Sequence, residues 1–166
     1  MDAIKSNYRK EVVDKLIPLA RGDERIILLV CDMGFGVTDR FKDEFPNRIF
    51  NVGMMEQGTV GIAAGIAMSG LLPIVYSIVN FLAFRALEQI RNDVILQNLN
   101  VKFIATGVND YFRFLGPSHC CGTQDIQLMK MIGMKIYDAY SPHTKMTFDE
   151  MIVNWVSNSK ASYVRV

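Results

Sequence analysis

The sequence of 166 residues lacks the marks of a secreted, membrane-spanning or strongly charged protein. Its three cysteines, Cys31, Cys120 and Cys121, form no CxxC motif and no even-numbered disulfide framework. No apolar run is long enough for a membrane span, and the N-terminus has no apolar signal region. With 18 basic and 17 acidic residues the net charge is +1, which gives no reason to expect nucleic acid or an anionic membrane as a partner. These absences favour a cytoplasmic protein in a reducing compartment.

Several common catalytic motifs are also missing. The sequence contains no GxxxxGK[ST] phosphate loop, no GxSxG nucleophile turn and no HExxH zinc motif. The segment Gly34-Phe35-Gly36 begins like a dinucleotide-binding fingerprint, but Asp39 stands where the third glycine belongs. An acidic residue at that position disfavours a bound pyrophosphate, so the pattern does not indicate a dinucleotide site.

Half of the residues are hydrophobic, and apolar runs alternate regularly with helical patterns. The pattern predicts an α/β fold: a three-layer, doubly wound, mostly parallel six-stranded sheet with helices on both faces. We expect one domain over residues 1–166, and a helix over 81–96 that turns Phe84, Leu87 and Ile90 inward. Strands are expected at 26–31, 48–52, 73–77, 101–106, 134–137 and 162–166. Further helices are expected at 4–21, 38–45, from the glycine turn after the second strand to about 70, at 124–132 and at 148–156.

Glu56 is the only acidic residue between Glu44 and Glu88, and it follows a glycine turn that joins the second strand to its helix. In an open α/β sheet, the carboxyl ends of strands are the usual place for a ligand. A carboxyl among methionines and glycines should be poorly solvated, and could then exchange a proton near neutral pH. Small residues at Gly58, Gly61 and Gly65 would let another subunit approach this helix. The alternative is an exposed first-turn glutamate that the helix dipole favours.

His119 lies in the segment Gly116-Pro117-Ser118-His119-Cys120-Cys121-Gly122, inside the long loop expected over 107–122. The histidine could contact a substrate, or it could bond to the backbone of its own loop. The two neighbouring cysteines could suggest a metal, but no second pair of ligands occurs elsewhere, so we expect no metal site in this chain.

Phe81 and Phe84 follow the third strand and are about one helical turn apart. One of these rings could stack on a flat heteroaromatic ligand. The alternative, which residue statistics favour, is that both belong to the core.

Together these segments resemble the pyrimidine-binding domain of the transketolase-like thiamine diphosphate enzymes. Residues 48–57, RIFNVGMMEQ, resemble that family's RxFxVGIAEQ segment, and residues 60–67 resemble the helix behind it. Tyr76-Ser77 with Phe81 and Phe84 resembles its YS…F…F segment, and residues 88–93, EQIRND, are similar to a helix of split transketolases. Residues 116–119 match the GPTH loop, and residues 162–165 match the closing strand. The resemblance covers nearly the whole chain in order.

The resemblance implies roles for individual residues. Glu56 matches the glutamate that hydrogen-bonds the aminopyrimidine ring of thiamine diphosphate and thereby activates the cofactor. Phe84 matches the ring that stacks on the pyrimidine, with Phe81 nearby, and Asp32 matches an acidic residue close to the cofactor. His119 matches a substrate-facing histidine that would bind a developing oxyanion or a donor hydroxyl.

The family binds the cofactor's diphosphate through Mg²⁺ on a GDG…N motif, which this sequence does not contain. The resemblance therefore implies a separate pyrophosphate-binding subunit that carries the motif and the Mg²⁺. It also implies self-association through the Glu56 helix, and a heterotetramer with two composite sites.

The implied reaction is the transfer of a two-carbon ketol or acyl unit from a sugar or keto-acid donor to an aldehyde. Leu115 stands where the family often has an acidic residue that reads donor hydroxyls, so ordinary pentose phosphates are doubtful substrates. Two alternatives stay open: a thiamine diphosphate-dependent 2-keto acid decarboxylase subunit, and a non-catalytic α/β partner module.

Overall fold

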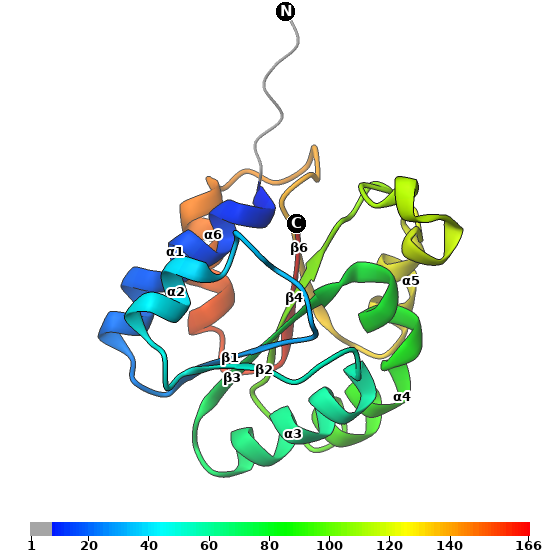
Figure 1. Ribbon diagram of the computed structural model, residues 1–166. Helices are drawn as coiled ribbons and strands as arrows, with labels where there is room; N and C mark the ends of the chain where they lie inside the picture. The colour runs from blue at the N-terminus through cyan, green and yellow to red at the C-terminus, as the bar shows by residue number, and fades with distance from the viewer. Residues whose placement is uncertain (1–7) are drawn as a thin grey trace, which may run out of the picture.

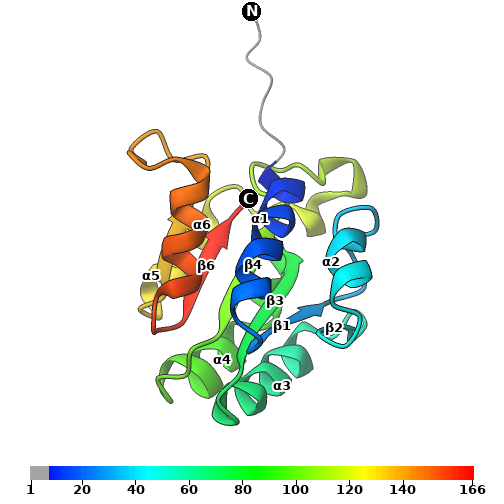
Figure 2. The same ribbon diagram turned by 90° about the vertical axis from the view of Figure 1, so that its left-hand side faces the viewer.

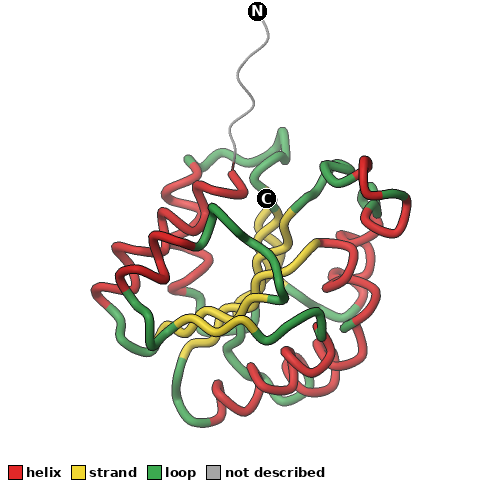
Figure 3. Tube along the Cα trace, viewed as in Figure 1, coloured by secondary structure: helices red, strands yellow, loops and turns green. Residues whose placement is uncertain are grey.

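The computed structural model describes residues 8–166, and six strands in it form one parallel sheet (Figures 1 and 3). The strand order is β2-β1-β3-β4-β6-β5, and every neighbouring pair is parallel. This confirms the fold class that the alternating apolar pattern predicts. The strands are β1 (Ile26–Val30), β2 (Ile49–Asn51), β3 (Leu72–Ile78), β4 (Lys102–Thr106), β5 (Lys135–Asp138) and β6 (Ser162–Arg165).

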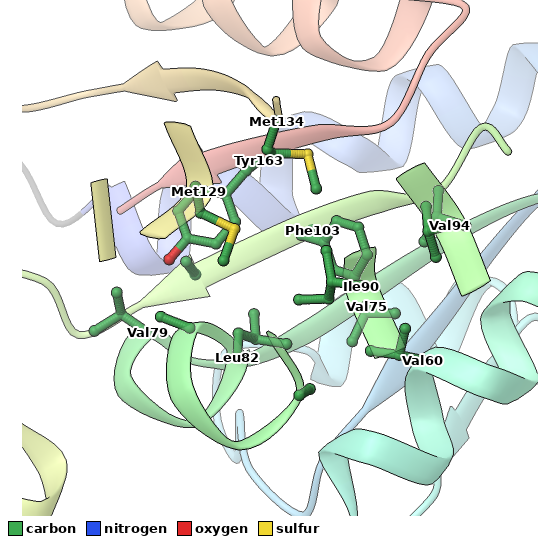
Figure 4. Close-up of a cluster of buried hydrophobic side chains, with 14 of the residues drawn as sticks. Val60, Val75, Val79, Leu82, Ile90, Val94, Phe103, Met129, Met134 and Tyr163 are labelled. Carbon is green, nitrogen blue, oxygen red and sulfur yellow. The ribbon is translucent and has the colours of Figure 1, made fainter. Parts of the chain in front are cut away.

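Helices cover both faces of the sheet (Figures 1 and 2). One face carries α1 (Tyr8–Gly22), α2 (Asp39–Glu44) and α6 (Phe148–Ser157). The other face carries α3 (Glu56–Met68), the helical segment that follows β3, and α5 (Gln124–Met131). Both faces of β1, β3 and β4 are therefore buried, which explains the unbroken apolar run of β1 and the mostly apolar sequences of β3 and β4. Figure 4 shows part of the core between the sheet and the helices of this face, where Val60 lies near Val75 and Met129 lies beside Tyr163 and Met134.

The order of the strands creates a crevice at the carboxyl end of the sheet. From β1 the chain passes outward to β2, and it then returns to place β3 on the other side of β1. The segments that leave β1 and β3 therefore diverge toward opposite faces of the sheet. Open α/β sheets bind ligands at such a switch point, so the fold predicts a ligand site at the residues after Val30 and after Ile78.

The segment after β3 differs from the single regular helix that the sequence predicts. It consists of π-helical turns at η1 (Phe81–Arg85), a short α4 (Leu87–Gln89) and further π-helical turns at η2 (Ile90–Ile95). Wider turns change which side chains face the sheet, and π-helical turns occur often at functional sites. The core-facing residues are Leu82, Ala83, Ala86, Ile90 and Val94. The expectation that Phe84 faces the core is wrong, because its side chain is 49% exposed.

The long segment between β4 and α5 folds as a loop with two short 3-10 turns, η3 (Arg113–Leu115) and η4 (Pro117–His119). The first four residues of the helix expected at 4–21 lie outside the described residues. None of the helices in residues 8–166 has the length and apolar character needed to cross a membrane.

Candidate active site

Glu56 is the first residue of α3, and its side chain is 1% exposed. The chain reaches it through a tight turn after β2, in which Gly53 has φ +81°. This backbone conformation is one that glycine adopts readily and other residues adopt rarely. The turn directs the Glu56 side chain toward β3. Its carboxyl group therefore lies inside the protein, near the C-terminal end of that strand, instead of in water.

Two side chains hydrogen-bond the Glu56 carboxylate. The Ser77 hydroxyl, at the end of β3, donates to Oε1 at 3.0 Å. The Arg85 guanidinium, from η1, donates to Oε2 at 2.6 Å and forms an ion pair with it. Arg85 is 43% exposed, so the pair joins a buried anion to a cation that still reaches solvent. The cation compensates a charge that would otherwise be very unfavourable in the interior.

Asn51 joins the loop after β1 to the turn before Glu56. Its side-chain oxygen accepts the backbone N–H groups of Asp32 and Gly53, each at 3.0 Å, and its amide donates to Asp32 Oδ1 at 3.1 Å. Asp32 has φ +48°, a left-handed conformation that aspartate tolerates better than most residues. Asn51 thus fixes both the Asp32 carboxylate and the turn that orients Glu56.

Phe81 connects the glutamate to the histidine. Its ring lies 5.0 Å from the His119 ring in an edge-on contact, and the Arg85 guanidinium lies 4.1 Å from its centroid on the ring face. The His119 loop is tied to η1, because the Asn80 side-chain amide donates to the Ser118 carbonyl. These contacts bring two distant segments of the sequence to one site.

A cavity of about 330 Å³ lies at the switch point, toward the lower end of the roughly 300–1,000 Å³ typical of ligand sites. Four of the five residues singled out in the sequence line it: Asp32, Glu56, Phe81 and His119. Phe84 does not line this cavity. It lines a separate depression of about 480 Å³ together with Gln57, Arg85, Glu88, Arg91 and Met131.

The cysteine thiols bond to groups other than the histidine, and the Cys120 thiol, next to His119 in the sequence, donates to the Gly116 carbonyl at 3.8 Å. Burial raises the pKa of the Cys121 thiol to about 11, with a further contribution from Asp125. Burial also raises the pKa of Cys31, whose thiol donates to Thr59 Oγ1 at 3.5 Å. Both side chains therefore stay as neutral thiols at neutral pH. Within residues 8–166, no group of three or more His, Cys, Asp or Glu side chains is placed to hold a metal ion.

Sequence reasoning missed three residues of this site. Arg85 could have been found, because a buried glutamate needs a cation or strong donors, and Arg85 follows Phe81 by about one helical turn. Asn51 gives no signal, since an asparagine at a strand end reads as an ordinary turn residue. Arg9 gives no sequence signal either, because it lies in α1, before every motif. Its side chain nevertheless lines the cavity, with its guanidinium 5.5 and 5.4 Å from the ring centroids of Tyr111 and Phe112.

Residues 5–157 match the protein family described as "Transketolase, pyrimidine binding domain". The chain is 32% identical over 132 residues to the 6-deoxy-6-sulfo-D-fructose transketolase subunit SqwH of Clostridium sp. (strain MSTE9). That match covers 78% of this chain and 41% of the relative. The chain is also 34% identical over 160 residues to the 1-deoxy-D-xylulose-5-phosphate synthase of Syntrophus aciditrophicus (strain SB), which covers 96% of this chain and 24% of that protein.

Among solved structures, a split gene transketolase described as an inactive β4 tetramer is similar to this chain with a TM-score of 0.80. The two are 28% identical, and the match covers 95% of this chain and 49% of that one. The chain thus spans less than half the length of each of these three proteins.

Proposed function

The chain belongs to the transketolase pyrimidine-binding domain family, and we propose that it is one subunit of a two-polypeptide thiamine diphosphate enzyme. The proposed reaction transfers a two-carbon ketol or acyl unit to an aldehyde acceptor. The observation that supports it most directly is the position of Glu56, a carboxyl 1% exposed that lines a cavity at the switch point beside an aromatic ring.

The residues of the cavity fit the pyrimidine half of the cofactor. When bound, thiamine diphosphate supplies a thiazolium carbon that acts as a nucleophile toward carbonyl groups. Glu56 would hydrogen-bond the ring nitrogen of the aminopyrimidine and control the proton on it. Ser77, which donates to Glu56 Oε1, would keep the carboxyl in position. Phe81 offers a ring face within the cavity, and Phe84 offers a second ring just outside it.

His119 and Asp32 line the same cavity as Glu56 and are suited to the remaining tasks. The His119 imidazole is held by the Ser118 hydroxyl at 3.1 Å and by the Phe81 ring. It would donate to the oxygen of the donor substrate on which negative charge develops. Asp32, fixed by Asn51, would contact the cofactor from the loop after β1.

A partner is part of the proposal because this sequence has no GDG…N motif to hold Mg²⁺ and the diphosphate. A pyrophosphate-binding subunit would supply both. On α3, Gly61, Ile62 and Gly65 are exposed and could meet a second copy of the chain. Two copies of each subunit would then form a heterotetramer with two composite sites.

Calorimetric titration with thiamine diphosphate and Mg²⁺ tests this proposal. We expect no binding to the purified chain alone, and saturable binding after the chain is mixed with a GDG…N protein encoded by a neighbouring gene. The partner alone should bind the cofactor more weakly than the mixture. If no mixture binds the cofactor, the chain is a non-catalytic module and the proposal is wrong.

A decarboxylase that acts on 2-keto acids is the second candidate, and Leu115 favours it. This apolar side chain lines the cavity at the position where donor hydroxyls would otherwise be read, so the cavity wall does not require a hydroxylated donor. Release of carbon dioxide from a 2-keto acid without an aldehyde acceptor would identify the decarboxylase. Group transfer instead requires the aldehyde.

A further inference from the structure

Within this chain, Arg85 contacts the two side chains that the aminopyrimidine ring of the cofactor would contact, Glu56 and Phe81. Its guanidinium donates to Glu56 Oε2 at 2.6 Å, and it lies on the face of Phe81 at 4.1 Å from the ring centroid. A guanidinium is flat and rich in nitrogen, so it can stack on an aromatic ring and meet a carboxyl group at the same time. An aminopyrimidine has the same two properties.

The two partners require opposite hydrogen-bonding states of Glu56. Arg85 has only donors, so the carboxylate must accept from it. Ser77 donates to the other oxygen, and both oxygens of Glu56 are therefore acceptors in this structure. An unprotonated ring nitrogen is itself an acceptor, and it needs a carboxyl that donates a proton. A proton on Oε2 that bonds the ring nitrogen leaves that oxygen a poor acceptor, so Arg85 and the ring nitrogen compete for Oε2.

Arg85 also lies between the two hollows of this surface. It contacts Glu56 and Phe81, which line the cavity, and it lines the neighbouring depression together with Phe84. Movement of its side chain would therefore open the cavity toward Phe84. Because Arg85 is 43% exposed, its guanidinium can turn into water when a ligand takes its place at the buried Glu56 carboxyl.

We propose that Arg85 is a further residue of the cofactor site, which occupies the Glu56–Phe81 pair in the cofactor-free chain and must leave it when the aminopyrimidine binds. This inference rests on the proposed function. Until the cofactor arrives, Arg85 keeps the buried carboxylate paired and the cavity closed on the side of Phe84. Its departure frees Oε2 and brings both phenylalanines within reach of one ligand.

The test compares thiamine diphosphate binding by complexes of the partner subunit with wild-type chain, Arg85→Met and Arg85→Lys. Arg85→Met removes the competitor, and we expect the Kd to fall by about two- to fivefold, as for the loss of one partly exposed ion pair. Arg85→Lys keeps a cation that can compensate Glu56, so the chain folds. The lysine cannot stack on Phe81 as a flat group, so the Kd should still fall, but less than in Arg85→Met. Arg25→Met is the matched control, because Arg25 is 65% exposed, pairs with Asp23 and lines neither the cavity nor the depression.

An unchanged or higher Kd in both Arg85 variants would overturn the inference, since it would mean that Arg85 does not compete or that it helps to bind the cofactor. A similar fall in Arg25→Met would overturn it as well, because the effect would then come from the loss of any positive charge. If the wild-type complex binds no cofactor, the proposed function fails first, and the inference fails with it.

Discussion

Residues 8–166 contain two buried carboxylates paired with arginines, and the two pairs differ in how they meet solvent. Asp125, at the start of α5, is 0% exposed, and its partner Arg165 is 2% exposed. Glu56 is 1% exposed, but its partner Arg85 is 43% exposed. The first pair is sealed inside the protein, whereas the second is open on the side of its cation.

The sealed pair has every feature of a structural anchor. Arg165 donates to Asp125 and to the Gly122 carbonyl, each at 2.8 Å, and Tyr163 donates to the same carboxylate at 3.3 Å. Burial and the nearby Asp125 raise the pKa of Tyr163 well above its usual range, so the phenol stays a donor. This network holds the end of the His119 loop against β6. The open pair has two donors and a cavity beside it, an arrangement that can exchange one partner for a ligand.

The largest effect should come from breaking the sealed pair. Asp125→Ala leaves Arg165 buried without its nearest anion, and we expect the free energy of unfolding to fall by roughly 3–5 kcal/mol. Urea denaturation of the isolated chain measures it. The control is Asp14→Ala, which breaks a pair with the 68% exposed Arg40 and should cost less than about 1 kcal/mol. Similar losses in the two variants would remove the distinction between sealed and exposed pairs.

The open pair should show a smaller and reversible effect. Arg85→Met leaves a buried acceptor without its donor, and we expect a loss of about 1–3 kcal/mol in the free energy of unfolding. Glu56→Gln in the same chain removes the uncompensated charge, so the double variant should recover part of the loss. A thermodynamic cycle of the four proteins measures the coupling. Strictly additive losses would show that the two side chains do not interact.

Another buried basic residue, Lys102, extends the comparison to a cation whose hydrogen-bond partners are backbone carbonyl groups. Its ammonium donates to the carbonyls of Asn158 and Lys160, at 2.5 and 2.7 Å. Burial first, and then Lys135, lowers its pKa from 10.5 to about 7. The unfolded chain thus binds more protons than the folded chain between these values, so stability should rise with pH across that range. The slope should be at most about 1.4 kcal/mol per pH unit.

Urea denaturation at several pH values between 7 and 10 measures this slope in wild type and in Lys102→Met. The methionine variant should lose the part of the slope that is due to Lys102. Equal slopes in the two proteins would mean that the carbonyl groups stabilise the ammonium enough to offset its burial.

The sheet could be predicted from the sequence because strands buried on both faces leave apolar runs, as in residues 26–30, or mostly apolar ones, as in residues 101–106. The placement of Glu56, Phe81, Asp32 and His119 around one cavity also follows, since parallel strands bring their carboxyl ends to one edge. The orientation of Phe84 did not follow, because π-helical turns change the helical period and leave no mark in composition. The pairing of Arg85 with Glu56 could not be predicted either, because the two residues lie 29 positions apart in the sequence.

Replacement of Glu56 tests the central claim most directly. In the complex with the partner subunit, Glu56→Gln should lower thiamine diphosphate-dependent turnover by about 10²–10⁴-fold, the range for loss of a general acid–base group. The isolated variant should stay folded, because glutamine can still accept from Ser77 and Arg85 can turn into water. Glu24→Gln, at an exposed position before β1, should leave turnover unchanged. Wild-type turnover in the Glu56→Gln complex would contradict the role assigned to this carboxyl.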